Sequence, residues 1–65
     1  MSSKYTRICG RDGECNVIAI AIQHMGCWKV IDQRDRKQYG SFNTRKRAES
    51  CLTERLGCTS LEHGF

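Results

Sequence analysis

Three consecutive cations stand where a helix is predicted to begin. Arg45, Lys46 and Arg47 occupy the predicted first turn. Asn43 and Thr44 both suit the N-cap, because either side-chain oxygen can accept a hydrogen bond from an early helical N–H. Unpaired N–H groups and the helix dipole already make a first turn positive, so each cation should cost about 0.3–1 kcal/mol. A local rule broken three times favours an anion-binding role for this segment.

Most of the positive charge gathers around the same segment. Between Lys29 and Arg47 lie seven cations and two anions, a local charge of +5, whereas the whole chain carries +4. Such a concentration is typical of a surface that meets a polyanion, an acidic protein or anionic lipid, although charges that merely keep a small domain soluble give the same pattern. The candidate nucleic-acid or anion-binding residues are Lys29, Arg34, Arg36, Lys37, Tyr39, Asn43, Thr44, Arg45, Lys46 and Arg47.

The five cysteines and two histidines do not follow a pattern typical of a metal or catalytic site. No Cys-x-x-Cys pair occurs, and the spacings from Cys9 to Cys15 and from Cys51 to Cys58 are too wide for a zinc knuckle. Catalytic Cys and His spacing, a glycine-rich phosphate loop and paired carboxylates are also missing. We therefore expect no metal, no cofactor and no enzymatic activity. Cys9 and Cys15 flank a predicted turn, so a local disulfide between them under oxidising conditions is geometrically feasible.

The clearest strand pattern runs over residues 15–23. Because side chains alternate along a strand, Ile18, Ile20 and Ile22 share one face, and the smaller residues between them share the other. We expect the isoleucine face to form the core. The smaller residues, on the predicted outer face, are Val17, Ala19 and Ala21.

Short turns connect this strand to its neighbours, which predicts an antiparallel meander with strands in sequential order. His24 to Gly26 is a plausible tight connection, and the basic segment 33–37 forms the next turn. Gly40 permits a bulge or a close approach in the last strand. The predicted strands cover residues 15–23, 27–32 and 38–42, with 5–9 as a candidate fourth.

A helix is predicted from residue 44 to about residue 56. Its apolar residues recur at helical spacing on one stripe, which would cover the isoleucine face of the sheet. Gly57 suits the position just beyond the helix C-terminus. We expect the basic turn and the helix start to lie in one region, as a single anion-binding corner. The residues of the apolar stripe are Ala48, Cys51, Leu52 and Leu56.

Size and composition predict one small α+β domain over residues 1–65, with the sheet at about 5–42, the helix at about 44–56 and a tail at 57–65. No run of apolar residues is long enough for a membrane helix. The polar start lacks the apolar core of a secretory signal. An odd cysteine count without an export signal disfavours a disulfide framework. We expect a cytoplasmic protein.

A short motif between Trp28 and Leu56 resembles known modules. It comprises Trp28, Val30 and Asp32, then the basic turn, Gly40-Ser41-Phe42-Asn43-Thr44 and Ala48-Glu49. This segment is similar to the three-stranded-sheet-plus-helix modules of plant AP2 domains and of the amino-terminal arm-binding domains of tyrosine recombinases, and to small bacterial domains of unassigned role. In the DNA-binding members, the resemblance implies a sheet laid in the major groove, with Arg, Lys and aromatic side chains on its exposed face.

The predicted outer face of the sheet departs from that pattern. Lys29 and Ser41 are its polar members, so it is flatter and less basic than a groove reader needs. Exposed apolar faces usually mark contact sites, so this face suits a protein interface or a homodimer equally well. Alternatively, the tail with Leu61 and Phe65 covers it. The candidate interface residues are Val17, Ala19, Ala21, Ile31 and Tyr39.

Two functions of different classes follow. In the first, favoured one, the domain binds nucleic acid, with DNA preferred, because its cations can contact the phosphate backbone. In the second, it is a small inhibitor or adaptor of the kind that phages and mobile elements encode. Its basic patch then meets an acidic protein surface or a nucleic-acid site on a larger complex.

Overall fold

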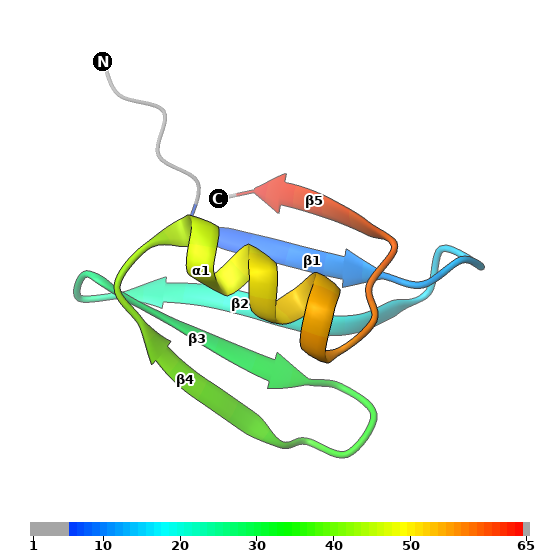
Figure 1. Ribbon diagram of the computed structural model, residues 1–65, viewed down its shortest axis with the longest axis horizontal. Coiled ribbons are helices and arrows are strands. Elements are labelled where there is room, and N and C mark those ends of the chain that lie inside the picture. The colour runs from blue at the N-terminus through cyan, green and yellow to red at the C-terminus, as the bar shows by residue number, and fades with distance from the viewer. Residues whose placement is uncertain (1–5, 65) are drawn as a thin grey trace.

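A five-stranded antiparallel sheet carries a helical segment on one face (Figure 1). The computed structural model of the chain describes residues 6–64. The predicted α+β class and the sequential meander are confirmed, but the sheet is larger than expected, with strand order β4-β3-β2-β1-β5. The elements are β1 (Arg7–Arg11), β2 (Val17–His24), β3 (Cys27–Asp32), β4 (Gln38–Phe42), α1 (Arg45–Ser50), the π-helical η1 (Cys51–Arg55) and β5 (Ser60–Gly64).

The sequence did not predict β5, which pairs antiparallel with β1. This strand, Ser60–Gly64, is only five residues long and largely polar. It forms because the edge of β1 offers backbone hydrogen-bonding partners. The tail therefore extends the sheet and does not cover a face, as far as residue 64. Two residues of the predictions lie outside the described residues: Phe65 of the tail, and Tyr5, with which the candidate fourth strand begins. β3 and β4 begin and end as predicted.

The tight turns follow from residues that tolerate a left-handed backbone. Met25 (φ 53°) and Gly26 (φ 81°) form the two-residue connection between β2 and β3, as expected. Gly40 has φ 129° at the point where the register between β3 and β4 shifts, so the predicted bulge is confirmed. This bulge brings Tyr39 and Phe42 to the same face of β4, where they pair across the strands with Val30 and Trp28.

The helical segment packs on the small-residue face of β2, which corrects the predicted orientation of the sheet. Ala19 and Ala21 are completely buried, whereas Ile22 keeps 41% of its surface exposed. Gly10 pairs with Ala19 on the same face, so three adjacent small residues let the helix backbone approach the sheet closely. Larger side chains on this face would overfill the space that Leu52 occupies.

The apolar stripe of the helix is buried as predicted, and the segment ends where expected. Gly57 has φ 77°, and the N–H of Cys58 donates to the Leu52 carbonyl over 3.0 Å, closing the last turn. The core cluster comprises Ile8, Ile18, Ala19, Ala21, Trp28, Val30, Ala48, Cys51, Leu52, Leu56 and Cys58.

Candidate nucleic-acid interface

The helix begins at Thr44, which is the N-cap. Its Oγ1 accepts a hydrogen bond from the Arg47 N–H over 3.2 Å, and its backbone is extended. No acidic residue lies in the first turn of α1, so the three cations are not neutralised within that turn. Lys46 and Arg47 are exposed. Asn43, the other predicted cap, is an exposed residue before the cap.

Arg45 is tied into a link between α1 and β5. Its Nε lies 3.7 Å from the Oε2 of Glu49, one turn along the helix. The same Glu49 oxygen contacts Nε2 of His63 on β5. Arg45 therefore belongs to a structural network, and Lys46 and Arg47 are the better-placed cations for a ligand at this end of the helix.

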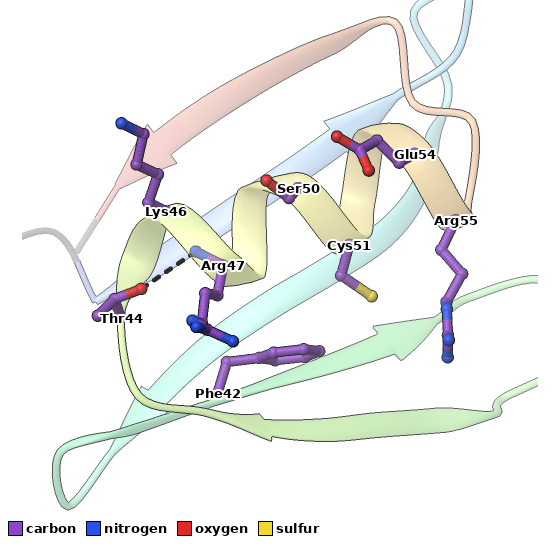
Figure 2. Close-up of a pocket in the computed structure, with 8 residues that line it drawn as sticks. All are labelled: Phe42, Thr44, Lys46, Arg47, Ser50, Cys51, Glu54 and Arg55. Carbon is purple, nitrogen blue, oxygen red and sulfur yellow. Dashed lines mark hydrogen bonds between the residues drawn. The ribbon is translucent and has the colours of Figure 1, made fainter.

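A groove of about 780 Å³ runs between the helical segment and β4 (Figure 2). Arg47, Cys51 and Arg55 are spaced four residues apart, and Figure 2 shows their side chains pointing from the helical segment toward the sheet. The Phe42 ring lies beneath Arg47 and Cys51, while Lys46 and Glu54 point away from β4. We call this the helix-side groove; its lining residues are Phe42, Thr44, Lys46, Arg47, Ser50, Cys51, Glu54 and Arg55.

Tyr39 extends the aromatic surface of the groove along β4. Its ring is half-buried, and the Arg55 guanidinium carbon lies 5.7 Å from the ring centroid, a cation–π arrangement. Phe42 is also half-buried and lies on the same face. Because β4 is an edge strand, these rings and the two arginines lie at a margin of the sheet that a long ligand can reach.

The basic turn and the helix start do not form one corner, which corrects the prediction. The β3–β4 loop lies near the C-terminal end of the helical segment, and β4 carries the chain back to its N-terminal end (Figure 1). Arg34 fixes this placement, because its Nη2 donates to the Leu56 carbonyl over 3.2 Å. Arg36 and Lys37 are exposed in the loop, away from Lys46.

Arg34 and Asp32 form a structural pair at the base of that loop. The guanidinium donates to both carboxylate oxygens, each over 3.1 Å, and the Arg34 backbone N–H donates to Oδ1 over 2.8 Å. These hydrogen bonds, the side-chain bond first, hold the pKa of Asp32 below its ordinary value. Arg34 is thus engaged within the protein, which makes it a weak candidate for a phosphate contact.

The face of the sheet opposite the helix is aliphatic at its centre. Ile20 pairs with Cys9 on one side and with Ile31 on the other, and Ile22 pairs with Arg7 and Lys29. Directly paired side chains share a face, so these residues lie together. We call this the open sheet face; its residues are Arg7, Cys9, Arg11, Val17, Ile20, Ile22, Lys29, Ile31 and Glu62.

The predicted interface residues are divided between the two faces. Val17 and Ile31 lie on the open sheet face, Ala19 and Ala21 are buried under the helix, and Tyr39 lies in the helix-side groove region. The sequence-based prediction assigned none of Phe42, Arg55, Arg7, Ile20 and Ile22 to a candidate site. The spacing of eight between Arg47 and Arg55 was a usable signal, because it places both on one row of a helix.

The five cysteines at positions 9, 15, 27, 51 and 58 are free thiols in this structure. Burial raises the pKa of the Cys51 and Cys58 thiols, so both remain protonated packing groups at neutral pH. Within residues 6–64, no three His, Cys, Asp or Glu side chains gather as a metal site. The helical segment in that range is not long and apolar enough to cross a membrane.

Comparisons of the chain with protein-family models, with curated proteins and with solved structures gave no match.

Proposed function

We propose that this protein is a non-enzymatic module that binds nucleic acid through the helix-side groove. One observation carries the proposal: two arginines on one helix row each lie near an aromatic ring of the edge strand β4, Arg47 near Phe42 and Arg55 near Tyr39. Lys46 lies at the rim of the groove with its side chain directed away from β4. Cationic grooves with aromatic side chains are the usual means of holding single strands, since phosphates follow the charges and bases stack on the rings.

Each group has a distinct role in this proposal. Arg47 and Arg55 contact phosphates at the two ends of the groove, and Lys46 adds a third charge at the helix start. Phe42 offers its ring to an unstacked base, which favours single-stranded over duplex nucleic acid. Glu54 is the one acidic lining residue, and its side chain points away from the groove floor.

The open sheet face does not serve this role as well. Its centre consists of isoleucines, which provide no hydrogen-bond donors for base edges or phosphates. A sheet laid in the major groove, as the resemblance to DNA-binding modules implied, would place these aliphatic groups against the bases. The proposal therefore uses the opposite side of the molecule.

Fluorescence anisotropy with a labelled 15-nucleotide single strand and its duplex tests the proposal over a range of salt concentrations. We expect tighter binding to the single strand, and log K should fall with log salt with a slope of about −2 for three phosphate contacts. Replacing both groove arginines, Arg47→Gln and Arg55→Gln, should weaken binding about tenfold or more and reduce the slope.

The matched control for Arg47→Gln is Arg36→Gln, which removes the same charge from the exposed β3–β4 loop, at the opposite end of the helical segment from Arg47. It should leave most of the affinity in place. Absence of binding at low salt, or an equal loss of affinity in the control and in the single variant Arg47→Gln, would overturn the proposal.

A further inference from the structure

No element of residues 6–64 covers the open sheet face, which is apolar at its centre. The helical segment lies on the other side of the sheet (Figure 1), and every strand of residues 6–64 belongs to the sheet itself. Val17 and Ile22 keep 38% and 41% of their surface exposed, and Ile20 and Ile31 between them are only partly buried. An antiparallel sheet with a solvent-exposed face normally carries polar residues there, so this aliphatic composition is typical of a contact surface.

We infer that the open sheet face is the interface of a homodimer, in which two copies pack sheet against sheet. The β-branched isoleucines on adjacent strands have the composition of the inner face of a β-sandwich, where two such faces interdigitate about 10 Å apart. Ile20 and Ile31 are direct cross-strand partners at the centre, so the apolar residues are contiguous.

The size of the sheet leaves room for a dimer interface. The molecule measures 34 × 22 × 17 Å, and the sheet extends along the two longer dimensions (Figure 1). The footprint of the whole molecule, charged rim included, is therefore at most roughly 750 Å² in projection, of the same order as the roughly 800 Å² of accessible surface that each partner buries in an interface of standard size.

The charged residues of this face form a rim around the apolar centre. Arg7 and Lys29 flank Ile22, and their long side chains can reach past the edge of the contact. Glu62, the acidic residue of the face, is already paired with Arg11 over 2.7 Å. Facing copies therefore repel each other at the rim, and added salt should strengthen the dimer.

The dimer would allow the protein to bridge two nucleic-acid segments. This consequence rests on the proposed function, whereas the inference of the dimer does not. Packing through the open sheet faces leaves both helix-side grooves on the two outer sides of the assembly. Two nucleic-acid segments would then bind on opposite sides, and the protein would bridge them. The two proposals are distinguishable because salt strengthens the dimer and weakens nucleic-acid binding.

Sedimentation equilibrium from about 1 to 300 µM protein, at low and at high salt, tests the inference. The wild type should approach twice the chain mass of 7.5 kDa, at lower concentration when salt is high. Ile22→Gln and, separately, Ile20→Gln should raise the dimer dissociation constant at least tenfold, with an unchanged far-ultraviolet circular dichroism spectrum. Met25→Gln, at a turn residue with 89% exposure, is the matched control and should dimerise as the wild type does.

A wild type that keeps the mass of one chain over the whole range would overturn the inference and leave the face to another protein. Equal dimerisation of the wild type and a folded Ile22→Gln variant would also overturn it. The affinity of Ile22→Gln for a short oligonucleotide, measured per chain, should stay at the wild-type level. Loss of that affinity would contradict the assignment of the two functions to separate faces.

Discussion

Gly10 lies directly beneath Cys58, so close that a Cβ atom at position 10 would stand 2.3 Å from the Cys58 Sγ. It would also come within 3.5 Å of Cδ2 of Leu52. The missing side chain therefore lets the end of the helical segment rest on β1. This contact lies on the covered face of the sheet, opposite Ile20 and Ile22 on the open sheet face.

Gly10→Ala should lower the free energy of unfolding by about 1–3 kcal/mol, because the added methyl group overfills a packed contact. Gly13→Ala is the control, since a Cβ there meets nothing within 4 Å. Urea unfolding measures both. Gly10→Ala should lower the free energy of unfolding by less in a Cys58→Ala background than in the wild type, because the clashing sulfur is then absent. Strictly additive effects of the two substitutions would argue against the contact.

The two faces of β2 should respond differently to changes in side-chain size. Ala21→Val places two methyl groups beneath the helix at a completely buried position, which should cost about 1–3 kcal/mol. Ile22→Ala, on the open sheet face, should cost less than Ala21→Val when both are measured as monomers at low concentration. A larger loss for Ile22→Ala would mean that the isoleucine face is the covered one.

Local patterns in the sequence predicted the strands β3 and β4, the helix stripe and its N-cap, because each depends on near neighbours. The covered face was predicted wrongly, since residue size was judged within β2 alone. The actual orientation brings Gly10 against Cys58, and these two residues are far apart in the sequence. β5 was missed for the same reason: its five residues pair with β1 and have little strand pattern of their own.

The sequence identified cations that line the groove, but it did not predict how the basic segments are arranged in space. The run from Arg45 to Arg47 does lie at a helix start, and Lys46 and Arg47 line a groove. The spatial separation of the basic loop could not be read from the sequence, because it depends on the path of β4. Arg34 could not be recognised as engaged until its bond to the Leu56 carbonyl was known.

Asp32→Asn should destabilise the protein at pH 7 and flatten its acid response. Because Arg34 lowers the pKa of the folded carboxylate, the stabilisation is complete above the unfolded pKa of about 4 and is lost as the pH falls through the folded pKa. Urea unfolding between pH 7 and pH 2 measures this. Arg34→Gln should have an effect of the same sign, and an unchanged slope below pH 4 in Asp32→Asn would contradict the pairing.

Lys46→Glu should stabilise the fold and weaken nucleic-acid binding at the same time. An acidic residue in the first turn complements the helix dipole, so we expect a gain of about 0.3–1 kcal/mol in the free energy of unfolding. Thermal unfolding and the anisotropy assay together test this trade-off. A variant that gains stability without losing affinity would remove Lys46 from the proposed contacts.

Thr44→Ala should cost about 1 kcal/mol, because the Arg47 N–H loses its capping oxygen. Thr44→Ser keeps the hydroxyl and is the control, which should retain most of the wild-type stability in the same urea titration. Equal stability of the alanine and serine variants would show that the cap contributes little to the position of the helix start.

The most direct test of the central claim is a titration of ¹⁵N-labelled protein with a short single-stranded oligonucleotide, followed by amide chemical shifts. Binding in the helix-side groove should place the largest changes on Phe42, on the helix start from Thr44 to Arg47, and on Cys51 and Arg55. Changes centred on the open sheet face, at Ile20, Ile22 and Lys29, would contradict it, as would a spectrum that does not change.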